Sequence, residues 1–480
     1  LGCFAKVKIF SLEFDFLCLI KYKIMERVLP KTIDYTDVLP LAVESKARRR
    51  TFFPVNGQSF SASGANIIRI DISADALLDT QHSYLRFTWT NDAAKTCGLD
   101  QAGAHAFIKR LRIEQSGTVL EDINSYNRLL GAVILPSQSG YDHASERGIT
   151  EGVGQRGGLP TLLTSMGTSV AASAAGSIVN GFAHQPATYV AAGQAIDMCI
   201  PLTSGIFNNE KLIPLMLMSA PLTIEIELAP LNEPVCFADQ AATDYTVSNV
   251  RYIANLVEVG QDVSQQLRMV QEMSGGVLTL AGQTYRHFTG AVTATTGDQI
   301  INVPARVKSM KSLFFVSQAT AGNAQNAYNI SVGGNMSLHE YQLKIGSVTY
   351  PPTPVRCNFG AGTLAAVVAN RAEPLMELAK AWGSVGGNKG MGQLTNQTYG
   401  QTEDGAVASA EVCSFTPFGL DLEAFQRVAI ESGVNTADRS LPISLILNYA
   451  VAPSATNVDV YVLADALFYI NGDGSMSVSV

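Results

Sequence analysis

The stretch Ile200–Pro230, IPLTSGIFNNEKLIPLMLMSAPLTIEIELAP, decides the fold. Its last part, Leu222–Leu228, alternates strictly between apolar and polar residues. Successive side chains of a β-strand point to opposite faces, so this alternation predicts a strand with one buried and one solvated face. Before it, Leu212–Met218 is apolar on both faces, which suits a segment buried on both sides, and Pro214 places the start of that segment at a strand edge or entry. The stretch indicates a β scaffold and not a catalytic site.

Strand patterns also lie on both sides of this stretch in the first half of the chain. The predicted strands are Asn66–Ile72, Tyr84–Thr90, Phe107–Glu114, Val119–Asp122 and Tyr245–Val259. The glycine-containing turn at Gln115–Thr118 predicts a hairpin between two of them. A short helix is expected within Ile123–Leu135, where Tyr126, Leu129, Leu130 and Val133 fall on one face.

The second half repeats this order of elements. Its predicted elements are a strand at Lys311–Val316, a hairpin of Tyr341–Ile345 with Val348–Tyr350, a helix at Leu375–Trp382, and strands at Pro442–Tyr449 and Val458–Ile470. The two sets lie roughly 200 residues apart, and each half has the size of an eight-stranded jelly roll. The sequence therefore predicts an all-β protein of two tandem jelly rolls with short helices and long loops.

The domain boundaries follow from these patterns. We expect an N-terminal arm at 1–50, a first jelly roll at 51–260, a linker helix at 261–275, a second jelly roll at 276–472 and a C-terminal tail at 473–480. The first methionine is Met25, and residues 1–24 are expected to be translated upstream sequence. Their apolar run at 16–20 is too short for a membrane span. Residues 137–192, rich in Gly, Ser, Ala and Thr, are expected to be a long inserted loop region.

Composition limits the classes of function. Only 15% of the 480 residues are charged, which suggests that subunit contacts cover much of the surface, although a large β core would also use few charges. The net charge of −8 argues against a bulk surface that binds nucleic acid. The basic run Lys46–Arg50 (KARRR) at the end of the arm suits phosphates, an acidic neighbouring subunit or a solvated tail.

Residue types that could carry catalysis or bind a ligand do not form a recognisable motif in this sequence. The seven cysteines are scattered, which favours buried free thiols in a reducing compartment, and no two of the six histidines are close in sequence. The glycine-rich Gly386–Gly392 lacks the context of a phosphate loop. The acidic residues are expected on solvated strand faces or in turns: Glu225, Glu227, Asp459 and Asp465, and Asp71, Asp75 and Asp79. We therefore expect no catalytic, cofactor-binding or metal-binding residues, and no enzyme.

With these runs laid out, the chain resembles the double jelly-roll major capsid proteins of eukaryotic DNA viruses, such as polinton-like viruses, virophages and nucleocytoplasmic large DNA viruses. The runs that carry the resemblance are Ile67–Asp71 with Ser83–Phe87, Arg110–Tyr126, Ile200–Leu228 and Tyr341–Val355. They span about Phe52 to Gly472. The long Ala/Gly/Ser-rich loops depart from the family's pattern.

The resemblance implies two eight-stranded jelly rolls, three chains in a pseudo-hexameric capsomer, and an icosahedral shell assembled in the host cell. Its partners would be other copies of the chain and minor capsid or penton proteins, with no sequence-specific nucleic acid. Loops 137–192 and 384–410 would form the outward tower or the trimer contacts, and residues 46–50 would face the interior or a minor capsid protein. The alternatives are a carbohydrate-binding or adhesin-like β-sandwich, and a cupin-type enzyme, whose histidine cluster is missing from the sequence.

Overall fold

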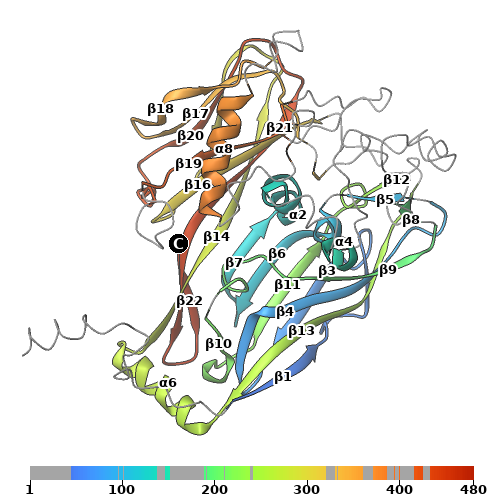
Figure 1. Cartoon of the computed structure of the whole chain (residues 1–480), viewed down its shortest axis with the longest axis vertical. Coiled ribbons are helices and arrows are strands. Elements are labelled where there is room, and N and C mark those ends of the chain that lie inside the picture. The colour runs from blue at the N-terminus through green and yellow to red at the C-terminus, as the bar shows by residue number, and fades with distance from the viewer. Residues whose placement is uncertain are drawn as a thin grey trace, which may run out of the picture. The chain divides into compact units, whose positions relative to one another are not determined.

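The computed structural model describes residues 45–480 except 96, 101, 138–145, 152–188, 191, 210, 238–241, 321–329, 332, 360–370, 386–393, 395–398, 401–415 and 425–432 (Figure 1). Within this part, strands dominate and the sheets are antiparallel. No strand of the first half pairs with a strand beyond helix α6 (Gln261–Met273) in the described residues.

The first half forms two main sheets and a small one. One main sheet has the order β1 (Ser45–Phe52), β13 (Thr246–Val259), β4 (Leu77–Thr90) and β10 (Ile213–Pro214), with β2 (Ser59–Ser61) on β13 and β9 (Ala195–Ile200) on β4. The other has the order β3 (Ile67–Ile72), β11 (Leu222–Leu228), β6 (Ile108–Gln115) and β7 (Thr118–Asn124). The small sheet contains β12 (Val235–Phe237), β5 (Cys97–Leu99) and β8 (Tyr189–Val190).

The second half repeats the two main sheets. One has the order β14 (Val277–Val292), β21 (Thr456–Asn471), β16 (Met310–Ala319) and β19 (Pro417–Asp421), with β22 (Met476–Ser479) on β21. The other has the order β15 (Gly297–Asn302), β20 (Ile443–Tyr449), β17 (Leu338–Ile345) and β18 (Val348–Arg356). In both halves the last long strand lies beside the first strand of its sheet, which is the strand order of a jelly roll. The predicted fold of two tandem jelly rolls is confirmed.

Short helices connect the strands. In the first half these are η1 (Gly103–Phe107), the consecutive turns α2 (Tyr126–Arg128), η2 (Leu129–Ile134) and η3 (Leu135–Ser137), α4 (Glu146–Glu151) and η6 (Leu215–Leu217). In the second half α8 (Ala372–Ser384) packs against β19 and β16. None of the helices in the described residues combines the length and the apolar character that crossing a membrane requires.

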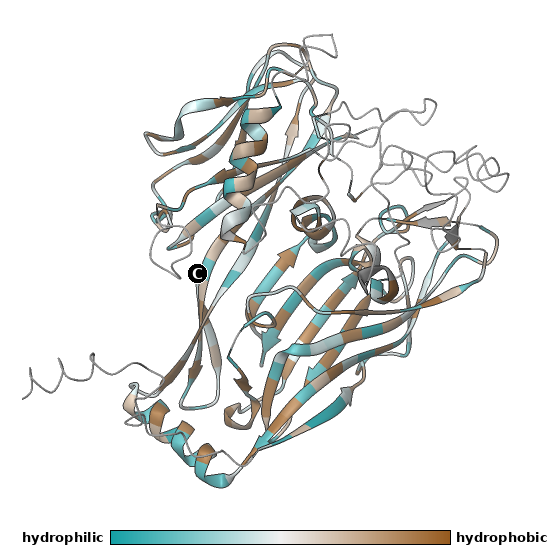
Figure 2. Cartoon of the chain, viewed as in Figure 1, coloured by the Kyte–Doolittle hydropathy of each residue, from teal (hydrophilic) through white to brown (hydrophobic). Residues whose placement is uncertain are grey.

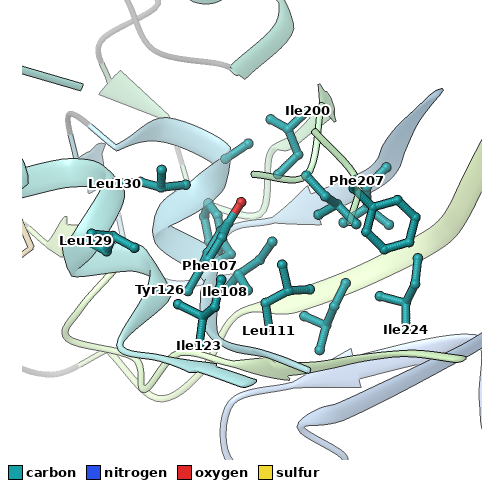
Figure 3. Close-up of a cluster of buried hydrophobic side chains, with 14 of the residues drawn as sticks. Phe107, Ile108, Leu111, Ile123, Tyr126, Leu129, Leu130, Ile200, Phe207 and Ile224 are labelled. Atoms are coloured by element: carbon teal, nitrogen blue, oxygen red, sulfur yellow. The ribbon is translucent and has the colours of Figure 1, made fainter. Parts of the chain in front are cut away.

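Strand β11 is the centre of its sheet, as its alternation predicts. It pairs with β3 on one side and β6 on the other, with Ile224 opposite Ile70 and Ile113. All three isoleucines are fully buried. Figure 3 shows side chains from several elements that meet in this core, among them Leu111 and Tyr126, and Figure 2 shows how apolar and polar residues alternate along the strands.

Three sequence predictions need correction. Leu212–Met218 is not a strand buried on both faces: β10 is a two-residue edge strand containing Pro214, and it is followed by η6, in which Met216 and Leu217 are half-buried. The arm ends earlier than residue 50, because β1 begins at Ser45 and pairs with β13 along its whole length. The C-terminal tail is also partly strand, because β22 pairs with β21. Backbone pairing explains both strands, since most of their side chains are exposed or half-buried.

Candidate functional site

The glutamates of β11 lie in a row of charges on the exposed face of their sheet. Glu225 forms ion pairs with Arg69, at 2.6 Å, and with Arg112, at 3.6 Å, on the two neighbouring strands. Hydrogen bonding and the charge of Glu225 raise the pKa of Arg69. Glu227 is half-buried on the same strand. Cross-strand pairs of opposite charge stabilise a sheet, so this arrangement favours a structural role for Glu225.

Asp71, Asp75 and Asp79 have separate environments. The Asp71 carboxylate accepts a hydrogen bond from Thr223 Oγ1 at 2.7 Å, and Asp79 contacts His82 Nδ1 at 2.7 Å. Asp75 is exposed. In the part of the chain that the structure describes, no group of three or more His, Cys, Asp or Glu side chains has a metal-binding arrangement.

Two further histidines and three cysteines have buried or half-buried side chains. The His287 side chain is 7% exposed and lies against the Tyr461 ring, and His105 is buried with its Nε2 3.8 Å from Glu151 Oε1. Cys97 and Cys357 are buried free thiols, and Cys199 is half-buried and free. Desolvation raises the pKa of all three thiols, which lowers their reactivity. Cys3, Cys18, Cys413, His143, His184 and Gly386–Gly392 lie outside the described residues.

Asp459 does not lie on a solvated face as predicted. Its carboxylate on β21 contacts Arg128 Nε of α2 at 2.7 Å and His287 Nε2 of β14 at 2.9 Å. The Arg128 side chain is only 5% exposed. Burial alone raises the pKa of Asp459, but the hydrogen bond with His287 and the charge of Arg128 outweigh it and lower that pKa. The apolar–polar alternation of β21 gave a wrong prediction for Asp459, because the alternation does not show that residues of the first jelly roll cover this face of the strand.

A second buried carboxylate joins the two jelly rolls beside β7. Glu121 accepts hydrogen bonds from the backbone N–H groups of Gly205, at 2.9 Å, and Ile206, at 3.4 Å, and from Thr284 Oγ1 of β14, at 2.9 Å. Burial is the largest influence and raises the pKa of Glu121. Nothing in the local sequence distinguishes Glu121 from an ordinary solvated hairpin residue.

Uncharged hydrogen bonds and apolar packing also connect the two jelly rolls. Trp382 Nε1 of α8 donates to the Val133 carbonyl at 3.0 Å, and Tyr461 OH donates to the Ser125 carbonyl at 3.1 Å. The backbone N–H of Met476 donates to Gln115 Oε1 at 2.5 Å. One continuous apolar core contains residues of both halves. The joint is therefore a packed interior, and not a flexible connection.

A polar pocket of about 460 Å³ opens at this joint. Its charged lining residues contact one another: Lys109 Nζ lies 2.6 Å from Glu233 Oε1, and Arg128 contacts Asp459. Their charges therefore already neutralise one another. These internal ion pairs indicate that the pocket residues hold the two jelly rolls together and do not form a substrate site.

The basic run Lys46–Arg50 is part of edge strand β1. Arg48 pairs with Glu258 at 3.1 Å, Arg49 donates to Tyr84 OH at 2.9 Å, and Arg50 donates to the Ser73 carbonyl at 3.3 Å. All five residues are exposed. The run is thus a fixed basic rim of a sheet, and these contacts leave its cations accessible to a partner.

No protein-family model matches the sequence, and no curated protein matches it. Solved capsid structures do match the fold. PBCV-1 VP54, a crystal structure that was fitted into a reconstruction of the virophage Sputnik, has a TM-score of 0.57 at 11% identity over 93% of this chain and 99% of that chain. The cryo-EM structure of the Sputnik virophage has a TM-score of 0.52 at 9% identity, over 94% and 92%.

The Faustovirus major capsid protein is a third match, with a TM-score of 0.51 at 10% identity over 93% of each chain. Sequence identity is very low in all three comparisons, whereas the coverage is nearly complete. Both jelly rolls, and the connection between them, therefore correspond. The chain has the double jelly-roll fold found in these viral capsid structures.

Proposed function

We propose that this chain is the major capsid protein of an icosahedral DNA virus. The observation that carries the proposal is the joint between the jelly rolls, seen together with the near-complete fold match to capsid proteins. A shell subunit must keep its two barrels in a constant relation, and Arg128–Asp459 and Glu121–Thr284 supply buried contacts between them. Such a subunit belongs in the virion.

Three copies would form one capsomer. Each half has the same strand order, so three chains place six similar jelly rolls around a threefold axis. That arrangement is pseudo-hexameric and tiles a closed shell. We assign residues 51–260 and 276–472, extended by the paired strands β1 and β22, to the two jelly rolls and residues 261–275, which contain α6, to the connection between them.

The proposed role is structural and not enzymatic. The Glu225 and Asp459 carboxylates contact cations, and Glu121 accepts several hydrogen bonds, as scaffold carboxylates do. We further propose that the basic rim of β1 contacts the shell interior or a minor capsid protein. Loops 137–192 and 384–410 would supply the tower or the trimer contacts, although most of both loops lies outside the described residues.

The experiment is to measure the mass of the recombinant full-length chain by sedimentation and to image the same sample by negative stain. Stable trimers of roughly hexagonal outline, or closed shells, are the expected result. A well-behaved monomer at all concentrations would contradict the proposal.

The basic rim has its own test. Replacing Arg48, Arg49 and Arg50 with glutamine keeps the backbone pairing of β1 and removes the positive charges together with their guanidinium contacts. Capsomers should persist, while assembly into shells with the minor capsid protein should weaken. Arg306→Gln in the second jelly roll is the matched control, because its guanidinium donates to the carbonyls of Asp438 and Leu441 in its own half. Normal shells from the triple variant would overturn the role of the rim.

A further inference from the structure

A buried lysine in the second jelly roll lies between two carboxylates. Lys311 Nζ is 2.9 Å from Glu423 Oε1 and 3.6 Å from Asp465 Oδ1. The three side chains are 5%, 1% and 8% exposed, respectively. Asp465 does not lie on the solvated face that the sequence predicts, and it also accepts a hydrogen bond from Ser309 Oγ at 2.6 Å. An amine, two carboxylates and a hydroxyl therefore share one enclosed site.

Backbone contacts hold this group in place. Lys311 lies at a bulge of β16, between Met310, opposite Ala464, and Ser312, opposite Leu463. The Lys311 carbonyl accepts a hydrogen bond from the Leu422 N–H, at 2.8 Å, beside Glu423. The Asp465 N–H donates to the Ser309 carbonyl at 3.1 Å. Three chain segments are thus fixed around the amine.

The Ser309 hydroxyl is held by packing as well. A side chain on Gly433 would collide with Ser309 Oγ, so glycine at that position leaves the space that the hydroxyl occupies. The hydroxyl then points its proton at Asp465 Oδ2. This hydrogen bond withdraws electron density from the Asp465 carboxyl group and makes its carbon a better target for a nucleophile.

We propose that Lys311 and Asp465 condense to an intramolecular isopeptide bond. Burying an ammonium and a carboxylate costs solvation free energy, and condensation replaces both charges with one neutral amide. Reacting groups held together in a rigid site behave as if at very high concentration, which compensates for the poor reactivity of a carboxylate. The geometry supplies the amine, the carboxyl group and a proton carrier in contact.

The reaction balances without a cofactor. Glu423 accepts a proton from the Lys311 ammonium, and the freed lone pair of Nζ attacks Asp465 Cγ. The Nζ–Cγ bond forms, one Cγ–O bond breaks, and the departing oxygen takes the proton from Glu423 and a second proton from Nζ. The products are an amide and one water molecule. Glu423 is regenerated as a carboxylate and is the catalytic residue of this step.

The primary test is the intact mass of the purified full-length chain under denaturing conditions. We expect a mass one water below that of the sequence, and a tryptic peptide in which the segments around Lys311 and Asp465 are joined. Trypsin should no longer cleave after Lys311, because its amine has become an amide. A full sequence mass with normal cleavage at Lys311 would overturn the proposal.

Variants identify the reacting groups. Lys311→Arg keeps the positive charge but lacks the primary amine, so it should show the full sequence mass, as should Asp465→Ala. Glu423→Gln keeps both reacting groups and should lose or greatly slow the condensation. Lys308→Arg is the matched control, because Lys308 Nζ contacts Ser479 Oγ at an exposed position; it should retain the loss of water.

One other reaction also removes a single water. The sequence contains Asp–Gly pairs at Asp404 and Asp473, where an aspartate can cyclise onto the next backbone nitrogen. That product would survive in Lys311→Arg and would leave Lys311 open to trypsin. A loss of water that persists in Lys311→Arg, or a cross-link mapped to Glu423 in place of Asp465, would therefore overturn the assignment.

Discussion

Arg128 of the first jelly roll and Asp459 of the second form a nearly buried ion pair of 2.7 Å. His287 contacts the other oxygen of the same carboxylate. Two barrels joined only by a linker would move independently, whereas this pair ties an inter-strand helix of one barrel to a central strand of the other. The joint is therefore part of the folded core.

Removing one partner of this pair should be costly. Arg128→Met removes the buried guanidinium that balances the charge of Asp459, and we expect the free energy of unfolding to fall by about 3–5 kcal/mol. Urea denaturation followed by circular dichroism measures the change. Arg48→Met is the control, because its pair with Glu258 is exposed and should contribute less than about 1 kcal/mol. Equal losses in the two variants would contradict the proposed importance of the joint.

Glu121 should make stability depend on pH. Burial raises the pKa of Glu121 in the folded state, so the folded protein binds this proton more tightly than the unfolded chain does. The contribution favours folding below the unfolded-state pKa of roughly 4 and is lost as pH rises through the higher folded-state pKa. Glu121→Gln should abolish this loss of stability with rising pH, and the measurement is denaturation across the pH range. Glu258→Gln, at an exposed position, should leave the pH dependence of the free energy of unfolding unchanged.

Asp92 should have the opposite dependence. Burial raises the pKa of its carboxyl group, but hydrogen bonds from the N–H groups of Thr243, Ala94 and Asp244 and from the Thr243 hydroxyl outweigh burial and lower the pKa to about 2. Its stabilisation is present above the unfolded-state pKa of roughly 4 and is lost as pH falls toward 2.

Asp92→Asn should lower the free energy of unfolding at neutral pH by about 2 kcal/mol, since charged hydrogen bonds to three N–H groups are weakened. It should also flatten the acid limb of the stability profile. The measurement is again denaturation as a function of pH. An unchanged acid limb in Asp92→Asn would show that other carboxylates set it.

The central strand should be sensitive to cavities. Ile224→Ala removes a fully buried side chain between β3 and β6, and we expect a loss of about 2–5 kcal/mol in the free energy of unfolding. Ile67→Ala is the matched control, because Ile67 is 46% exposed on the neighbouring strand β3. A similar loss in both would mean that β11 is not the centre of the core.

Strands with one buried face could be predicted from the sequence. Leu222–Leu228 and Ile443–Tyr449 alternate between apolar and polar residues, and both are strands at these positions. Strands β1 and β22 could not be predicted, because six of the eight residues of β1 are exposed and β22 is short. Their stability comes from backbone pairing with β13 and β21, which leaves no periodic trace in the side chains.

The charged joint could not be predicted either. Alternation along β21 separates its two faces but does not reveal what covers each one, so the pattern predicts a solvated position for both Asp459 and Asp465. Arg128 lies next to apolar helical residues and resembles an ordinary surface cation in sequence. Partners such as Arg128 and Asp459 are distant in sequence and meet only when both jelly rolls have folded. The resemblance to capsid proteins predicts the fold of the two jelly rolls. Neither that resemblance nor the local sequence patterns predict the contacts between them.

The contact of Gln115 with the chain's last strand has a consequence for synthesis. The Gln115 amide donates to the Gly474 carbonyl at 3.1 Å, and its oxygen receives the Met476 N–H. The first barrel therefore lacks part of its packing until the ribosome has released residue 476. A growing chain therefore leaves the Gln115 side of its first barrel uncovered until the residues that follow the second barrel have emerged. The first barrel is translated first, yet it completes its packing only after the second barrel has been made.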